Sequence, residues 1–449
     1  MVHRTPGGRP TTTRRGETLT LYSWLVSPYS AKLRSFLHFH GIAYNDVRPS
    51  ALQLNYTLIK PAVGRAIMPT IRTSTGSWLQ DSTIICDDLD ASSTVPSTLG
   101  GAQRIASLLI ELLADEWLPL LTLHWRWNIA GNAAFAIDEF AANSFPLLPL
   151  FISRRLAAQV AESMKVYRPI VGISDATIPG IETYTAMLIA TLDAHLSCDE
   201  TPFLLGGRPC RGDFALSAAL WAHLYRDPHT RYLFDDAPAV ALWLERLHTA
   251  ASGDAPLPRR PNPAAGAPSA PPRVATMSAR EVASRSSFLA RDRPDGGVPR
   301  SLDPIFTTLF DETWPFLRRA SDALDAWIEG NADTAVNQRV PRGLGWIPLT
   351  VGGGVGRRRI VTFQLWKAQR PRDALRSLRE RMRQQPSSSA AADELGRATR
   401  WLRRVGGLDA LGQHHPAFRL LRSVEGARGE ELRFVRAPPQ SGSQQQAKL

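Results

Sequence analysis

The chain has 449 residues, of which 43% are hydrophobic, enough for two or three domains with apolar cores. This composition excludes a chain that is disordered throughout. A formal net charge of +12 invites a nucleic-acid hypothesis, but the positive residues gather in a few segments and no nucleic-acid-binding module accompanies them. We therefore expect no specific nucleic-acid partner.

The cellular location can be predicted from the length of the apolar runs and from the composition of residues 1–17. No run of 18 apolar residues occurs, and residues 1–15 lack the apolar middle of a secretory signal, so we expect no transmembrane segment and a cytoplasmic protein. Four arginines precede the first acid, Glu17, as in a mitochondrial presequence, which makes a mitochondrial location the alternative. Pro6 and Pro10 oppose the amphipathic helix of such a presequence and favour a disordered tail over residues 1–17.

The three cysteines, Cys86, Cys198 and Cys210, are scattered along the chain. Their spacing is neither that of a disulfide framework nor that of a zinc site. We expect free thiols and no metal.

Residues 18–37 are predicted to form a strand, a tight turn and a helix, because an apolar run is followed by apolar residues at helical spacing. Pro28 suits the first helical turn, where its missing N–H costs nothing. Ser27 would then lie just before the helix, with its hydroxyl among unpaired N–H groups at the positive end of the dipole. The turn suits a sulfur or carboxylate anion, or Ser27 is a plain helix cap.

The next segments predict a thioredoxin-like order, βαβαββα. After the first strand and helix we expect a short strand at 42–47, a weak helix at 51–60, a hairpin around Gly76 at 68–79 and a further helix at 81–89.

With this order, three motifs resemble the amino-terminal domain of the glutathione transferase superfamily. They are the Ser-Pro-Tyr-Ser turn at residues 27–30, Met68-Pro69 before the hairpin, and Asp81-Ser82 opening the next helix. The resemblance implies that glutathione is the co-substrate, that the bond before Pro69 is cis, and that the backbone of Met68 pairs with glutathione. Asp81 would pair with the γ-glutamyl ammonium and Ser82 with its carboxylate.

Two further parts of the site follow from the same resemblance. Lys60 or Arg65 is placed by position to meet the glycine carboxylate of glutathione. Relatives with cysteine at the position of Ser27 form a mixed disulfide with glutathione, which a serine cannot do.

The Ser27 hydroxyl can instead hydrogen-bond the glutathione thiolate and lower the pKa of the thiol, so it is the candidate catalytic group. Tyr29, Tyr22 and Ser30 are nearby alternatives for this hydrogen bond. Lys32 and Arg34, in the next turn, either add positive potential near the sulfur or face solvent.

Residues 103–247 are helical in pattern and predict an all-α second domain. It resembles the carboxy-terminal domain of the superfamily most closely at residues 202–220, where Asp213 holds the acid position of a capping box and Cys210 replaces the serine or threonine cap. The aromatic clusters at residues 115–117 and 124–127 either hold an apolar co-substrate or pack the core.

The remainder resembles the carboxy-terminal extension of a bacterial-type subgroup of transferase-like proteins. We predict a long helix at residues 306–329 interrupted near Pro315, a glycine hairpin with strands at 347–351 and 360–363, and helices at 373–383 and 391–405. The glycine-rich residues 351–356 lack the lysine and hydroxyl of a phosphate-binding loop. Arginines at 372, 376, 379 and 383 share one helix face, which predicts a solvated basic stripe.

The expected fold class is an α/β thioredoxin-like domain, an all-α glutathione transferase carboxy-terminal domain and a mostly helical extension. In chain order, we expect a disordered tail (1–17), the thioredoxin-like glutathione-binding domain (18–95) and the all-helical domain (100–250). A Pro/Ala-rich linker (251–275), the extension (276–435) and a second disordered tail (436–449) follow.

The expected function is conjugation of the glutathione thiolate to an apolar small-molecule electrophile, by a protein that can form homodimers as is usual in the superfamily. The alternative is a non-catalytic interaction module of the same fold, as in metaxin-like relatives, whose basic extension contacts an acidic partner or a membrane surface.

Overall fold

The computed structural model describes most of the chain, in the ranges 18–92, 99–198, 202–253, 257–260, 297–331, 341–412, 420–425 and 431–436. The predicted tail at residues 1–17, most of the predicted linker, the first part of the extension and residues 437–449 lie outside the described residues. Among the helices that the structure describes, none is both long and apolar enough to cross a bilayer.

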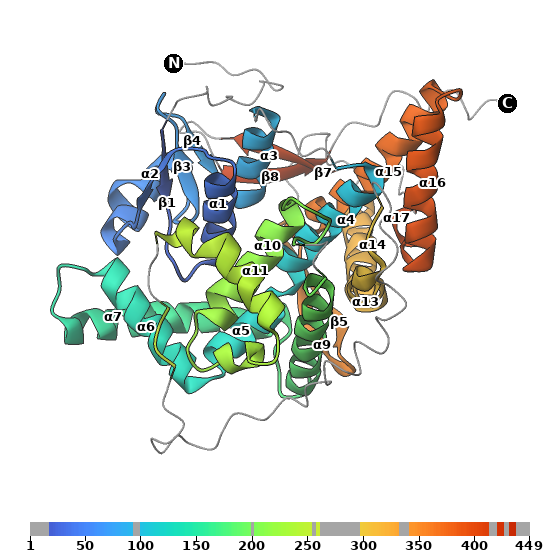
Figure 1. Cartoon of the computed structure of the whole chain (residues 1–449). Coiled ribbons are helices and arrows are strands. Elements are labelled where there is room, and N and C mark those ends of the chain that lie inside the picture. The colour runs from blue at the N-terminus through green and yellow to red at the C-terminus, as the bar shows by residue number, and fades with distance from the viewer. Residues whose placement is uncertain are drawn as a thin grey trace.

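The first domain has the predicted thioredoxin-like order (Figure 1). Its sheet has the strand order β2-β1-β3-β4, in which β1 pairs in parallel with β2 and antiparallel with β3. The elements are β1 Leu19–Tyr22, α1 Pro28–Phe39, β2 Tyr44–Val47, the π-helical turn η1 Gln53–Thr57, α2 Ile59–Val63, β3 Thr70–Arg72, β4 Trp78–Gln80 and α3 Ser82–Ser92.

The second part is helical, as predicted, and lies below and beside the sheet domain in Figure 1. Its longer helices are α4 Gly101–Leu112, α5 Pro119–Trp127, α6 Ala130–Ser144, α7 Leu150–Lys165, α9 Ile178–Leu196, α10 Arg211–Leu220 and α11 Pro238–His248. Short helices between and after them are η2 Leu113–Trp117, α8 Tyr167–Val171, η3 Trp221–Tyr225, η4 Arg231–Phe234 and η5 Ala250–Ser252.

The extension wraps the far side of α4, at the right of Figure 1. It is mostly helical, as predicted, and adds two strand hairpins. Its elements are η6 Arg300–Leu302, α13 Asp303–Thr308, η7 Leu309–Thr313, α14 Trp314–Gly330, β5 Gly343–Val351, β6 Gly354–Val361, α15 Thr362–Gln384, α16 Ser389–Arg404, α17 Gly407–Gly412, β7 Leu420–Glu425 and β8 Glu431–Arg436.

Three predicted starts in the extension are wrong. The first hairpin strand begins at Gly343 rather than residue 347. The second hairpin strand begins at Gly354 rather than residue 360, because Arg357 and Arg359 point outward while Arg358 and Ile360 alternate inward, so three adjacent arginines conceal a strand. The following helix begins at Thr362 rather than residue 373. The predicted helix at 306–329 is interrupted by the π-turn η7, next to Pro315 as expected.

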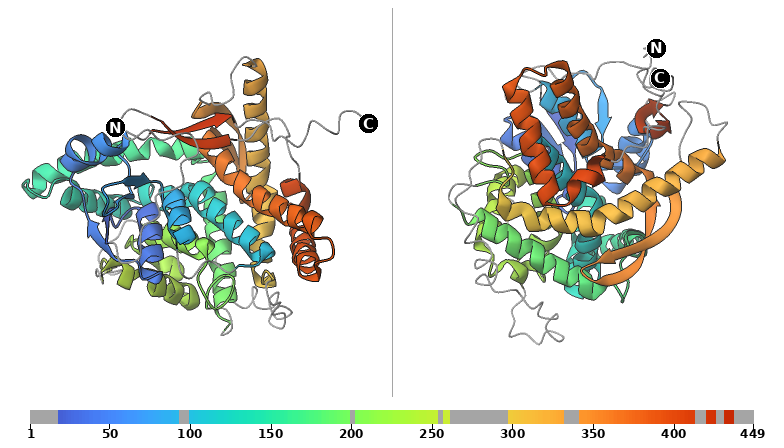
Figure 2. Two further views of the ribbon diagram at one scale, coloured as in Figure 1. Left: turned by 90° about the horizontal axis from the view of Figure 1, so that it is seen from above. Right: turned by 90° about the vertical axis from the view of Figure 1, so that its right-hand side faces the viewer.

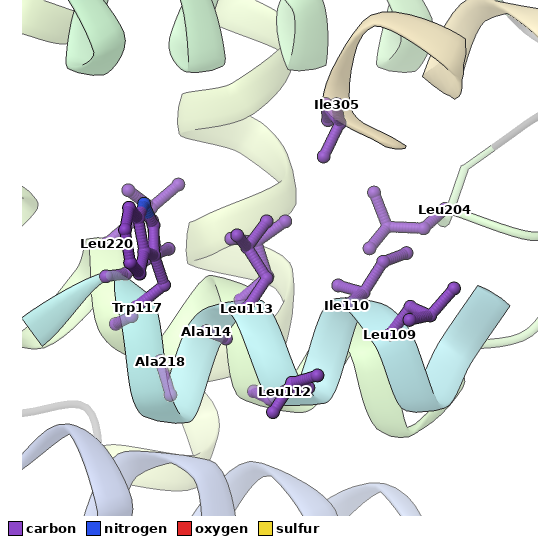
Figure 3. Close-up of a cluster of buried hydrophobic side chains, with 14 of the residues drawn as sticks. Leu109, Ile110, Leu112, Leu113, Ala114, Trp117, Leu204, Ala218, Leu220 and Ile305 are labelled. Atoms are coloured by element: carbon purple, nitrogen blue, oxygen red, sulfur yellow. The ribbon is translucent and has the colours of Figure 1, made fainter. Parts of the chain in front are cut away.

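One hydrophobic core runs through the sheet domain, the helical part and the extension. Figure 3 shows its centre, where side chains of α4 and η2 meet those of α10 and, from the extension, Ile305. Trp117 lies there with almost no exposed surface. The extension therefore covers an apolar face of α4 that would otherwise contact water.

The hairpin β5–β6 reaches the first turn of α9, and Figure 2 shows it curving past that green helix. Gly180 and Gly352 meet there through their backbones, so a Cβ on Gly180 would overlap the carbonyl oxygen of Val351. Gly352 also has φ +50°, which favours glycine. Only glycine at position 180 permits this approach.

We expect Gly180→Ala to lower the free energy of unfolding by about 1–3 kcal/mol, because the added methyl group must displace backbone rather than a side chain. Gly207→Ala is the matched control, since a Cβ there meets no atom within 4 Å. Urea unfolding of both variants measures the effect. Equal midpoints for the two variants would contradict the close contact of α9 and the hairpin.

Candidate functional site

The register of the sheet brings three distant segments to one edge. Tyr22, the last residue of β1, pairs with Thr70, the first of β3, and Thr70 pairs with Gln80, the last of β4. The residues that follow β1, precede β3 and follow β4 therefore emerge together. These are the turn before α1, the Met68-Pro69 pair and the Asp81-Ser82 pair.

Ser27 is the N-cap of α1, with the extended backbone (φ −93°, ψ 121°) typical of that position. Its Oγ accepts a hydrogen bond from the Ser30 N–H over 3.2 Å. A hydroxyl that accepts one bond still has its own hydrogen to donate. The buried Arg126 holds the adjacent backbone from the second domain, because its guanidinium donates to the Val26 carbonyl oxygen over 2.8 Å.

The two alternative tyrosines lie in different settings. The Tyr22 ring is buried on the α2 side of the sheet, where it stacks on Trp78 with 5.3 Å between ring centroids. The Tyr29 hydroxyl donates to the main-chain carbonyl of Asp115 over 3.0 Å. Desolvation and the nearby charges of Glu116 and Asp115 raise the pKa of Tyr29 well above its usual value, so it stays a neutral donor that is already engaged.

Asp81 has φ +76°, and it is the one described residue other than glycine with a positive φ. Its Oδ1 accepts hydrogen bonds from the N–H groups of Thr83 (2.9 Å) and Ile84 (3.3 Å), which caps α3. A short polar side chain tolerates this conformation best, and such outliers are concentrated at binding sites. Ser82 follows as the first residue of α3 and is buried.

The peptide bond between Met68 and Pro69 is cis, as the resemblance implies. The Met68 side chain packs against a buried cluster that contains Trp24 and Val26, from the segment just before Ser27. Lys60 is exposed and Arg65 is half-buried, both near α2.

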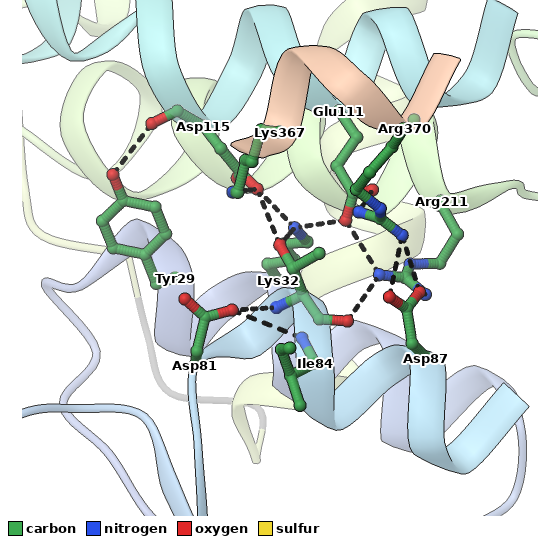
Figure 4. A network of polar contacts seen from close by, with 12 residues as sticks. Tyr29, Lys32, Asp81, Ile84, Asp87, Glu111, Asp115, Arg211, Lys367 and Arg370 are labelled. Carbon is green, nitrogen blue, oxygen red and sulfur yellow. Dashed lines mark hydrogen bonds and ion pairs between the residues drawn. The ribbon is translucent and has the colours of Figure 1, made fainter. Parts of the chain in front are cut away.

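A buried network of charges joins the first domain to the rest of the chain (Figure 4). Two carboxylates of the helix α4–η2, Glu111 and Asp115, lie at its centre and are almost fully buried. Lys32 of α1 contacts both, with Nζ 2.7 Å from Glu111 Oε1 and 2.6 Å from Asp115 Oδ2. The sheet domain is thereby fixed to the second domain one helical turn from Ser27.

Further cations surround the same two carboxylates. Arg211 of α10 lies 2.8 Å from Glu111, and the extension supplies Arg370, 2.7 Å from Glu111, and Lys367, 2.5 Å from Asp115. Both arginines also reach Asp87 of α3. The cations hold the pKa values of Glu111 and Asp115 below their usual range despite burial, so both stay ionised.

Glu116 behaves differently from its two neighbours. Within the described residues, its carboxylate pairs with one cation, Lys367 at 3.5 Å, while Arg358 donates to its main-chain carbonyl, and burial raises the pKa of Glu116 to about 7. Arg358 of β6 lies beside it, with the guanidinium over the rings of Trp117 and Phe316 at 5.1 and 5.3 Å. Burial lowers the pKa of Arg358 to about 10.

The solvent-facing interpretation of Lys32 and Arg34 is wrong. Both are 1% exposed, and Arg34 pairs with Asp46 at 2.6 Å. Because carboxylates neutralise both side chains, neither leaves net positive charge for a sulfur at the turn. A sequence signal existed: Glu111 and Asp115 are four residues apart on an otherwise apolar helix, and Lys32 lies on the face of Phe36.

The two aromatic clusters of the second domain serve as core. Trp117 and Trp125 are at most 1% exposed, and the Trp125 indole donates to Thr185 over 3.0 Å. Trp127 belongs with Trp24 and Val26 to a second buried cluster, against which half-buried side chains pack, among them Met68, Leu54, Ile137 and Phe145.

Both bonds of the capping box of α10 are present, because the Cys210 side chain accepts from the backbone N–H of Asp213 and the Asp213 side chain accepts from that of Cys210. Asp213 accepts hydrogen bonds from the N–H groups of Cys210 (2.9 Å) and Leu204 (3.0 Å) and from the Trp243 indole (3.0 Å). Burial raises the pKa of the Cys210 thiol well above its usual value, so Cys210 is an inert, packed residue.

The predicted basic stripe is only partly solvated. Arg372 lies over the Trp314 ring at 5.1 Å, and Arg376 pairs with Asp373. Arg383 is exposed, as expected.

Residues 21–96 match the family model described as the glutathione S-transferase N-terminal domain. No curated protein matches the chain. Solved structures with a similar fold include a glutathione S-transferase from Rhodospirillum rubrum F11 (17% identity, 55% of this chain and 96% of that one, TM-score 0.34). A glutathione transferase family member from Pseudomonas fluorescens Pf-5, with bound glutathione, is 19% identical over 54% of this chain and 100% of its own (TM-score 0.31). A β-etherase from Sphingobium sp. strain SYK-6 is 19% identical over 53% and 99% (TM-score 0.34).

We expect Lys32→Met to lower the free energy of unfolding by about 3–5 kcal/mol, because it leaves two buried carboxylates with fewer cations. Lys165→Met is the matched control. Lys165 pairs with the exposed Glu162, and losing such a surface pair costs at most about 1 kcal/mol. Urea unfolding at neutral pH measures both, and equal losses would contradict the role of the network.

Glu116 predicts a pH dependence of stability. Its pKa is about 7 in the folded chain and near 4.5 when unfolded, so the folded state binds more protons between these values. The free energy of unfolding should therefore fall, by about 3 kcal/mol at most, as pH rises from 4.5 to 7.

Glu116→Gln should remove this contribution and be the more stable form at pH 8. Urea midpoints of wild type and variant at pH 5, 6, 7 and 8 test this expectation. A difference between the two proteins that does not change with pH would count against it.

Proposed function

The chain carries a glutathione S-transferase N-terminal domain over residues 21–96, which places it in that superfamily, and from this premise we propose that it binds glutathione and transfers it to an apolar electrophile. The observation that carries the proposal is the sheet register. It gathers the Ser27 turn, the Met68-Pro69 bond and the Asp81-Ser82 pair at one edge.

We propose a partner for each part of glutathione. The N–H and hydroxyl of Ser82, at the start of α3, suit the γ-glutamyl carboxylate, and the carboxylate of Asp81 suits the ammonium. The backbone of Met68, next to the cis bond, is the proposed partner of the cysteinyl part. Lys60 and Arg65 are the proposed partners of the glycine carboxylate.

The proposed chemistry is stabilisation of the glutathione thiolate by Ser27. Its Oγ already accepts from the Ser30 N–H, so its hydrogen is directed to another acceptor, and the positive end of α1 adds a favourable field. Tyr22 is buried away from the turn and the Tyr29 hydroxyl is engaged with Asp115, which favours Ser27 among the three.

For the electrophile we propose the half-buried apolar side chains Met68, Leu54, Ile137 and Phe145. They pack against the cluster that contains Trp24 and Val26, from the segment just before the Ser27 turn. We propose the same division into domains as the sequence predicts, and a homodimer as the assembly.

A specific observation favours the second candidate, a non-catalytic interaction module. The loop before α7 and the start of that helix expose Leu147 (95%), Leu150 (67%) and Phe151 (76%), and Figure 1 shows α7 projecting from the body. Exposed apolar surface of this kind is typical of contact sites. Calorimetry with glutathione separates the two candidates, because no heat of binding at millimolar glutathione would contradict the enzyme.

If glutathione binds, Ser27→Ala should raise the pKa of its bound thiol by about 1–2 units, because a hydrogen bond to the charged form is lost. Ser27→Thr should restore the wild-type value. The ultraviolet absorbance of the bound thiolate across pH measures this pKa, and turnover with a model electrophile should fall by about tenfold or more.

Ser388→Ala is the control for loss of a helix cap, because Ser388 caps α16 as Ser27 caps α1, with its Oγ 3.3 Å from the Ala391 N–H. Both substitutions should cost about 0.5–2 kcal/mol of stability, and only the first should change the thiol pKa. An unchanged thiol pKa in Ser27→Ala would assign the role to another group.

A further inference from the structure

The extension contains a cavity of about 250 Å³ that is separate from the candidate glutathione site. It lies between the segment that leads into η6 and one face of α16. Its lining is strongly basic and includes one large aromatic residue, and comprises Gly297, Val298, Arg300, Arg397, Arg400, Trp401 and Arg404.

The arginines of α16 recur at a spacing that places them on one side of the helix. Arg397, Arg400 and Arg404 are three and four residues apart, so they follow each other along one face. Arg404 is neutralised, because it forms two hydrogen bonds with Asp303, at 2.6 and 3.0 Å. Within the described residues, neither Arg397 nor Arg400 has an acidic partner.

The aromatic residue of the lining is Trp401. Its side chain is 3% exposed and contacts Phe306 edge to face, with ring centroids 5.0 Å apart. Its indole Nε1 is buried and has no hydrogen-bond partner in the described part of the chain. Because this N–H has almost no accessible surface, Trp401 contributes ring carbons to the lining of the cavity and no donor.

We propose that this cavity is a binding site for a small polyanion that carries at least two phosphate or carboxylate groups. Guanidinium groups bind such oxygens in pairs of parallel hydrogen bonds, and two arginines without acids repel each other until an anion lies between them. Val298 and the Trp401 ring offer apolar contact to the rest of the molecule.

The site would give the extension a ligand of its own. It shares no residue with the edge of the sheet at Ser27, so its failure and that of the proposed transferase can be told apart. α16 also touches the second domain, because the Glu394 side chain accepts a hydrogen bond from the N–H of Gly101 at the start of α4.

Calorimetry on the full chain with inorganic pyrophosphate and with citrate, at constant ionic strength, tests the proposal and separates phosphate from carboxylate ligands. We expect at least one of the two to bind. The double variant Arg397→Gln/Arg400→Gln should bind it at least about tenfold more weakly.

The control is Arg383→Gln/Arg403→Gln, which removes the same charge from exposed positions of α15 and α16 that do not line the cavity. It should bind as the wild type does. The proposal would be overturned if neither probe binds at millimolar concentration. It would also be overturned if the control variant loses as much affinity as Arg397→Gln/Arg400→Gln, because the effect would then come from the net charge of the chain and not from the cavity. Without ligand, Arg397→Gln/Arg400→Gln should melt no lower than wild type, because a repulsion is removed.

Discussion

Two carboxylates, Glu111 and Asp115, determine how the parts of this chain are held together. A single carboxylate without a partner is expensive to bury, and here two lie one helical turn apart inside the core. They are tolerated because cations from α1, α10 and α15 converge on them. Each of these elements is therefore positioned relative to α4 by charge as well as by apolar contact, and none can shift without leaving a buried charge unpaired.

This constraint reaches the candidate site through α1. Lys32 anchors that helix to α4, and Ser27 begins the same helix, so the turn that would hold a sulfur is set by an ion pair about one turn away. Arg126 adds a second anchor from the other side, at the Val26 carbonyl. The geometry of the turn thus depends on residues of the second domain and the extension that never contact a ligand there.

Much of the fold could be predicted from local pattern. The strand, turn and helix around Ser27, the cis bond before Pro69 and the helical second domain all follow from short-range signals or from motifs in the sequence. The roles of Ser27, Met68, Asp81 and Ser82 remain predictions.

What the sequence concealed depends on distant partners. Lys32 and Arg34 look like surface residues, because nothing near them indicates the carboxylates that they meet. Arg358 is the middle one of three arginines, and only strand alternation distinguishes it from its exposed neighbours. The start of α15 could not be predicted either. Lys367 and Arg370 in its first turns resemble solvated residues in the sequence, and only the packing of α4 against them supplies their carboxylate partners.

The close approach of the β5–β6 turn to α9 has a consequence for helical phase. The turn at Gly352 is held against Gly180, β6 runs from there, and α15 begins directly at its end. The number of residues in β6 therefore sets both the face on which Arg358 emerges and the rotation of α15. One inserted residue would turn that helix by about 100° and reverse the strand alternation. The length of β6 thus determines whether Lys367 and Arg370 face α4.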